Sequence, residues 1–176
     1  MYADNTLTPK EAARLCALGV LATYETVSYV ELAAAVRHFI DRVQGPSLDV
    51  LGSSLELLKY EGLVRTTGTG ANAQLTLTDT GRDEFTTLLT AGLRPGATDL
   101  NKLIVALKFR FLHMLDAEAQ RVQVDLMLDT VETELTRLID LRTHHAGEPG
   151  HLKSWLDREI SELSGRAVWL RNFQPL

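Results

Sequence analysis

The residue types that could ligate a metal gather in one short segment of the chain. It holds His144, His145, Glu148 and His151, with glycine and proline between them. A metal site requires ligands whose side chains converge, and a segment of this composition does not fix them in one arrangement. We therefore interpret the segment as a solvated loop between two helices and predict no metal site.

A glycine-rich segment at 67–70, Thr-Gly-Thr-Gly, has the residue types of a loop that cradles phosphate. It lacks the Gly-Lys-Ser/Thr ending of such a loop, and it lies between two stretches that resemble β-strands. The tip of a β-hairpin is the better interpretation. No nucleophile and base stand at a local spacing elsewhere in the chain. The sequence thus predicts a protein that is not an enzyme and that holds no cofactor.

A further set of polar side chains has the chemistry of a nucleic-acid contact surface. Hydroxyl groups and basic side chains donate hydrogen bonds to phosphate oxygens and to base edges. The candidate residues are Ser53, Ser54, Lys59, Arg65, Tyr29 and Asn72. Since they are spread over more than forty positions, only the right fold brings them to one surface.

The elements that would position them are a helix and a β-hairpin in direct succession. Leucines within 51–58 recur at i, i+4 and i+7, the spacing of one helix face. Gly62 stands where a helix ends in a residue of positive φ. Extended stretches at 63–64 and 74–77 then flank the glycine-rich tip at 67–70. A helix followed by a two-stranded hairpin is the second half of a winged helix-turn-helix.

Two earlier helices and one later helix complete this unit. Thr8 with Glu11, and Ser28 with Glu31, have the types and spacing of capping boxes at helix starts. A fourth helix follows Gly81. The segment 91–96 holds two glycines and a proline and is the best linker candidate. We predict a mainly α protein, with a winged helix-turn-helix and its two-stranded β-wing at residues 1–92 and a helical dimerisation domain at residues 97–176.

Two long helices of the second domain carry apolar residues at spacings of 4, 3, 4 and 3. The residues are Val124, Leu128, Val131, Leu135 and Leu138 in the first helix and Leu156, Ile160, Leu163, Ala167 and Leu170 in the second. Such narrow, coiled-coil-like seams are most simply buried against the same pair of helices from a second chain. We expect a homodimer through these residues. The alternative is a helical hairpin within one chain, folded onto the first domain.

Composition sets limits on where and how the protein works. The formal net charge of the 176 residues is −5, and residues 1–90 hold seven basic and eleven acidic residues, or 7 − 11 = −4. A surface that binds phosphates should instead be basic. The chain has no apolar run long enough for a membrane span and no signal-peptide pattern at its start, which predicts a cytoplasmic protein. Cys16 stands alone among apolar residues, which predicts a buried, inert thiol.

Several short motifs resemble those of the PadR family of bacterial transcriptional regulators. They are Leu18-Gly19-Val20-Leu21, Ser28-Tyr29, Leu55-x-x-Leu58-x-x-Glu61-Gly62-Leu63-Val64, Leu77-Thr78-x-x-Gly81 and Leu115-Asp116-Ala117-Glu118-Ala119. The sequence departs from the family pattern at Gly52-Ser53, where the family has a Tyr-Pro pair, and in the wing, where only Arg65 is basic. The resemblance covers nearly the whole chain.

The resemblance implies a DNA-binding transcriptional regulator, a homodimeric repressor in the first instance, with duplex DNA and a small-molecule effector as partners. It places the helix at 51–60 nearest the DNA. The acidic first half favours an alternative, a winged-helix protein that acts through protein contacts as the antagonist or adaptor of a regulator. The electrostatic character of the predicted contact surface decides between them.

Overall fold

The chain folds into two compact units. The computed structural model describes residues 6–45, 51–70, 73–96 and 98–176. The first unit comprises residues 1–92 and 98–112, and the second comprises residues 93–97 and 113–176. The sequence places a single boundary after residue 92, whereas the structure returns residues 98–112 to the first unit.

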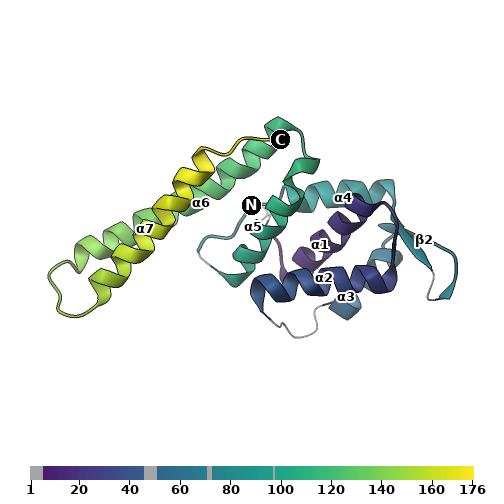
Figure 1. Ribbon diagram of the computed structural model, residues 1–176, viewed down its shortest axis with the longest axis horizontal. Coiled ribbons are helices and arrows are strands. Elements are labelled where there is room, and N and C mark those ends of the chain that lie inside the picture. Colours follow the sequence, from purple (N-terminus) through teal and green to yellow (C-terminus); the bar gives the residue numbers. More distant parts are fainter. Residues whose placement is uncertain (1–5, 46–50, 71–72, 97) are drawn as a thin grey trace, which may run out of the picture. The chain divides into compact units, whose positions relative to one another are not determined.

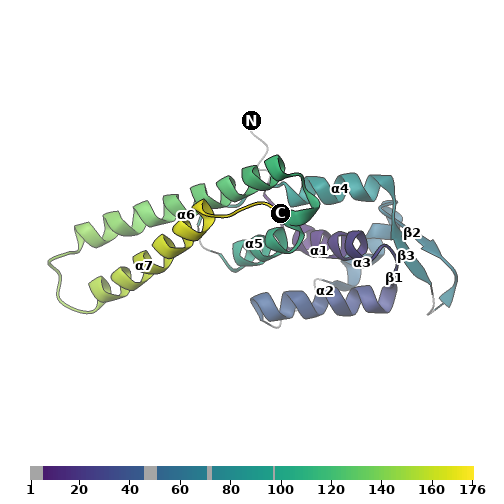
Figure 2. The same ribbon diagram turned by 45° about the horizontal axis from the view of Figure 1, so that its top comes forward.

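The first unit is a winged helix-turn-helix (Figures 1 and 2). Its helices are α1 (Pro9–Tyr24), α2 (Tyr29–Gln44), α3 (Leu51–Tyr60), α4 (Asp79–Leu89) and α5 (Asp99–Phe111). Its strands are β1 (Val27–Ser28), β2 (Val64–Thr67) and β3 (Gln74–Leu77). This order of elements confirms the predicted fold class.

The strands form one antiparallel sheet in the order β1-β3-β2, seen at one end of the unit in Figure 2. β2 and β3 pair from Val64 with Leu77 to Thr67 with Gln74, and this hairpin is the predicted wing. β1 adds a third strand, which the two-stranded prediction missed, by pairing Val27 with Leu75. The sheet therefore ties the start of α2 to the wing.

α1 is the centre of the first unit. Every residue from Leu15 to Leu21 is buried, because the helix is apolar on all sides and is covered by α2, α3, α4 and α5. Cys16 is among these residues, as predicted, and burial raises the pKa of its thiol to about 12 although the charge of Arg110 opposes this. A thiol held in its protonated form is a poor nucleophile, so Cys16 is inert.

The predicted capping boxes are present at both helix starts. The Glu11 carboxylate accepts from the Thr8 N–H at 2.7 Å, and the Thr8 hydroxyl accepts from the Glu11 N–H at 3.3 Å. Ser28 and Glu31 repeat this exchange at the start of α2, at 3.0 and 3.3 Å. The hydrogen bonds from Ser28 lower the pKa of the Glu31 carboxyl. Both helices therefore begin where the sequence predicts.

α5 belongs to the first unit because of a close approach to α1. A Cβ on Gly19 would lie 2.4 Å from two atoms of the Phe111 ring, so only glycine lets the ring reach the α1 backbone. Phe111 also meets Phe85 of α4 edge to face, with ring centroids 5.8 Å apart. The sequence assigns residues 99–111 to the second domain, since apolar spacing reveals a buried face without identifying its partner.

The second unit is a hairpin of two long helices, α6 (Ala117–His144) and α7 (Leu152–Arg171) (Figure 1). The seam residues Val124, Val131, Leu156, Ala167 and Leu170 are buried in the single chain. The remaining predicted interface residues are half-buried, namely Leu128, Leu135, Leu138, Ile160 and Leu163. The two seams thus pack against each other. α6 and α7 therefore form a hairpin within one chain, and a homodimer through these residues stays a prediction.

Polar contacts join the same two helices. Arg171 of α7 binds Glu132 of α6 at 2.5 Å, and Arg142 of α6 binds Asp157 of α7. The Arg142 guanidinium lowers the pKa of the Asp157 carboxyl, chiefly through the hydrogen bond between them. Within the described ranges, no helix of either unit combines the length and apolar character needed to cross a membrane.

Candidate nucleic-acid interface

α3 ends in a left-handed glycine turn that leads directly into the wing. Gly62 has φ of 72°, and its N–H donates to the Lys59 carbonyl at 3.1 Å. The N–H of Leu63 donates to the Leu58 carbonyl at 2.9 Å. Together these bonds form a Schellman motif, which satisfies two carbonyls at the end of the helix. The predicted helix stop at Gly62 is confirmed, and it fixes the direction in which β2 leaves α3.

Thr78, which directly follows β3, is hydrogen-bonded to the same turn. Its N–H donates to the Leu63 carbonyl at 3.1 Å, and its hydroxyl donates to the Gly62 carbonyl at 2.7 Å. The same hydroxyl accepts from the N–H of Gly81 at 3.0 Å and so caps α4. This explains the spacing Thr-x-x-Gly in the sequence. The end of α3, both strands of the wing and the start of α4 are held as one assembly.

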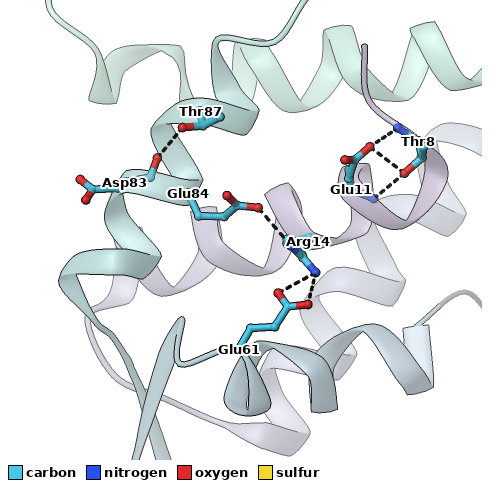
Figure 3. A network of polar contacts seen from close by, with 7 residues as sticks. All are labelled: Thr8, Glu11, Arg14, Glu61, Asp83, Glu84 and Thr87. Atoms are coloured by element: carbon cyan, nitrogen blue, oxygen red, sulfur yellow. Dashed lines mark hydrogen bonds and ion pairs between the residues drawn. The ribbon is translucent and has the colours of Figure 1, made fainter. Parts of the chain in front are cut away.

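Arg14 supports this assembly from α1, as Figure 3 shows. Its guanidinium lies 2.8 Å from a carboxylate oxygen of Glu61, at the end of α3, and 3.1 Å from one of Glu84 on α4. The Arg14 side chain is 22% exposed, so the pairs are partly shielded from water. Arg14 carries one positive charge, so the group of Arg14, Glu61 and Glu84 still has a net charge of 1 − 2 = −1.

Of the predicted contact residues, the structure describes the side chains of some and not of others. Lys59, in the last turn of α3, and Arg65, on β2, are both exposed. Neither binds a carboxylate within the part of the chain that the structure describes. Ser53 and Ser54 belong to α3, but their side chains lie outside the described part. Asn72 lies outside the described residues altogether.

Tyr29, the first residue of α2, lies at the surface. It is 36% exposed. Desolvation raises the pKa of the Tyr29 hydroxyl, and the charge of Glu56 raises it further.

α3 exposes three residues that were not among the predicted contact residues, namely Glu56, Leu57 and Tyr60. Leu57 is 41% exposed and Tyr60 is 89% exposed. The signal was available, because positions i, i+1 and i+4 face away from the leucines at 55 and 58 in a helix, and those two leucines are buried. A carboxylate, an aliphatic group and a phenol thus lie among the side chains that α3 presents to solvent.

The histidine-rich segment between α6 and α7 shows one local contact. His145 Nδ1 lies 2.7 Å from Glu148 Oε1, and the rings of His144 and His145 meet edge to face. Over the described residues, no group of three or more His, Cys, Asp or Glu side chains is arranged to hold a metal ion. His145 is accordingly engaged by its own loop.

The fold and this surface define a class. Helix-turn-helix proteins place their second helix, here α3, in the major groove of DNA, and a wing lies beside it in this variant. A family model described as "Putative AphA-like transcriptional regulator" matches residues 2–174. The chain belongs to this family and is a transcriptional regulator of the winged-helix class. The predicted function is confirmed in this respect, and the family gives no support to the alternative, an adaptor without DNA binding.

Solved structures of PadR-type regulators are similar to this chain, in line with the predicted resemblance. Bacillus subtilis PadR in complex with p-coumaric acid is 16% identical, with a TM-score of 0.41 and coverage of 94% of this chain and 95% of that one. The same protein with operator DNA is 19% identical, with a TM-score of 0.38 and coverage of 93% and 97%. A PadR-like regulator from Bacillus cereus is 17% identical, with a TM-score of 0.37 and coverage of 90% and 93%. None of the curated proteins matches the chain.

Proposed function

We propose that this protein is a cytoplasmic repressor that binds duplex DNA directly, with α3 in the major groove and the β2–β3 wing along the phosphate backbone. The observation that carries the proposal is the pair of exposed cations, Lys59 and Arg65, at the two ends of the Gly62 turn. The turn and the bonds of Thr78 hold the two elements together, so both cations are carried on one rigid support.

Salt dependence tests the proposal quantitatively. Binding to duplex DNA releases counterions, with a slope of log K against log salt of about −0.9 per neutralised phosphate. Two subunits with two cations each predict a slope of roughly −3 to −4. Lys59→Ala should weaken binding to all sequences alike and flatten the slope by about 2 per dimer. The measurement is fluorescence anisotropy with duplexes from the promoter region of the protein's own gene, at several salt concentrations.

A matched control uses a cation on the second unit. Arg166 is exposed on α7, and its replacement by alanine should leave the slope unchanged. A wild-type slope near roughly −8 would contradict the assignment, because it would require a basic surface beyond Lys59 and Arg65. Absence of binding to any duplex at low salt would overturn direct DNA binding itself.

We also propose that the protein acts as a homodimer through the hairpin of α6 and α7. The seams account for the buried side of the hairpin, but apolar residues remain on its outer surface. Trp155, Val168 and Trp169 of α7 are between 51% and 54% exposed. Large aromatic side chains in water favour burial against a second copy, since exposed tryptophan is costly and is enriched at interfaces. Half-buried seam residues such as Leu163 would border this contact.

Sedimentation at micromolar concentration checks the dimer. The wild-type protein is expected to sediment as a dimer, and the double variant Trp155→Glu with Trp169→Glu should dissociate at least tenfold more readily because carboxylates would be desolvated in the contact. Ser161→Glu, exposed on the same helix, is the matched control and should stay dimeric. Unchanged helical circular dichroism would show that the hairpin is intact. A wild-type monomer would contradict the proposal.

The small-molecule effector implied by the resemblance stays a prediction. A groove of about 520 Å³ runs along the exposed side of α2 and offers a candidate place for such a molecule. Its lining residues are Tyr29, Val30, Ala33, Ala34, Arg37, His38 and Asp41. An occupant of this groove would contact Tyr29, the first residue of α2.

A further inference from the structure

Arg14 of α1 binds two carboxylates that come from two other parts of the first unit. Its guanidinium lies between Glu61, which directly follows α3, and Glu84 of α4, as Figure 3 shows. Nη2 lies 2.8 Å from Oε2 and 3.0 Å from Oε1 of Glu61, and Nη1 lies 3.1 Å from Oε1 of Glu84. One side chain thus connects α1 with the end of α3 and with α4.

These contacts fix a direction that apolar packing leaves less defined. α3 is held against the core by Leu55 and Leu58, which are 5% and 1% exposed. Apolar contacts are non-directional, so they leave room for a helix to rotate or slide. A guanidinium is planar and its donors point in fixed directions, so it accepts only certain placements of its two carboxylates. Arg14 therefore restricts how the end of α3 is oriented on α1.

The end of α3 is also where the cations of the proposed DNA-binding surface lie. Lys59 stands two residues before Glu61, and Arg65 stands four residues after it, on β2. Hydrogen bonds at the turn after α3 join α3 and the wing to each other. Arg14 joins this assembly to α1. A change in the contacts of Arg14 would thus reach DNA through the placement of Lys59 and Arg65.

We propose that Arg14 is a positioning residue for DNA binding, which orients Lys59 and Arg65 toward the duplex through its contacts with Glu61 and Glu84. The inference rests on the proposed function, since it requires that α3 and the wing bind DNA. It goes further by giving two carboxylates a supporting role in the binding of a polyanion. Charge alone predicts the opposite, because the loss of a negative charge should tighten binding to DNA.

Anisotropy titrations of the full-length protein with a duplex that the wild type binds test the inference. Glu84→Gln removes one partner of Arg14 together with one negative charge. Its dissociation constant should rise by about 2- to 5-fold for each subunit that contacts the duplex, the range expected for one partly exposed ion pair. Arg14→Lys should cause a rise of similar size, because lysine keeps the charge but lacks the planar fork that spans two carboxylates.

The salt dependence separates positioning from a loss of stability. In the wild type, Lys59→Ala should flatten the slope of log K against log salt by about 2 per dimer. In the Arg14→Lys background the same change should flatten the slope by less, because Lys59 no longer meets its phosphate fully. The slope does not depend on the fraction of folded protein, so it can be read even in a destabilised variant.

Asp83→Asn is the matched control for Glu84→Gln. It removes the same charge from the neighbouring, exposed position on α4, and the Asp83 carboxylate points away from Arg14 in Figure 3. It should bind DNA as tightly as the wild type or more tightly. If Glu84→Gln and Arg14→Lys do the same, Arg14 does not position the surface, and the inference is overturned while the proposed function stands. If the wild type binds no duplex at low salt, the proposed function fails and the inference fails with it.

Discussion

Replacement of Gly81 by alanine is expected to destabilise the first unit by about 3 kcal/mol or more, an effect at the upper end of those caused by overpacking. A Cβ at this position would lie 2.0 Å from the Leu63 carbonyl oxygen and 3.1 Å from Cδ2 of Leu77. The first contact is with backbone, which cannot turn aside as a flexible side chain can. Relief would require α4 to move away from the wing, which would break the three hydrogen bonds of Thr78.

Denaturant unfolding followed by circular dichroism measures this effect, and Gly165 provides the control. Gly165 lies within α7, and a Cβ there would meet no atom within 4 Å. Gly165→Ala should therefore stabilise the second unit by about 0.5–1 kcal/mol, as alanine does in the interior of an exposed helix. An effect of Gly81→Ala within about 0.5 kcal/mol of wild type would show that the close approach to Leu63 does not exist in solution.

Features set by neighbouring residues were predictable from the sequence. The capping boxes at Thr8 and Ser28, the glycine stop at Gly62 and the hairpin around 67–70 all depend on side chains within a few positions of one another. Their physical cause is local, because a cap or a positive φ is decided by the residues that form it. The winged helix-turn-helix followed from these signals, and the structure confirms it.

Features set by contacts between distant residues were not predictable. β1 is only two residues long, and it exists because Val27 pairs with Leu75, forty-eight positions away. α5 carries an ordinary apolar face, and the absence of a Cβ on Gly19 decides where that face packs. The seams of α6 and α7 have the spacing of a coiled coil, but spacing does not distinguish a partner helix in the same chain from one in a second chain.

In the candidate site, too, features set by residue type were predictable and features set by distant contacts were not. Lys59 and Arg65 were found from their types, and the structure leaves both exposed. A sum of charges also does not show which groups pair, such as Arg14 with Glu61 and Glu84.

Two buried titratable groups in the first unit should give its stability an unusual dependence on pH. Lys108 is 1% exposed, and its Nζ donates to the carbonyl of Leu89 at 2.6 Å, at the end of α4. Desolvation lowers the pKa of Lys108 from 10.5 to about 8. Burial raises the pKa of Cys16 from 9.0 to about 12. The two shifts have opposite consequences above neutral pH.

The sign of each contribution follows from which state binds more protons. Between pH 8 and 10.5 the unfolded chain keeps the Lys108 proton more often than the folded chain, so raising the pH stabilises the fold, by about 2–3 kcal/mol from pH 7 to pH 10. Above pH 9 the unfolded chain loses the Cys16 proton first, so raising the pH destabilises the fold, by about 1.4 kcal/mol at pH 10. The wild-type free energy of unfolding should rise from pH 8 to 9 and then level off.

Urea unfolding at pH 7, 8, 9 and 10 separates the two groups. In Cys16→Ala the free energy of unfolding should continue to rise to pH 10. In Lys108→Met this rise should be absent, and the free energy of unfolding should fall above pH 9. Lys102→Met, an exposed position on the same helix, should keep the wild-type profile. The comparison uses the change in the free energy of unfolding with pH. The cavity in Cys16→Ala and the lost hydrogen bond in Lys108→Met shift that free energy equally at every pH, so they do not affect the comparison. Parallel profiles for the wild type and Lys108→Met would mean that Lys108 is solvated in the folded state, contrary to its burial between α4 and α5.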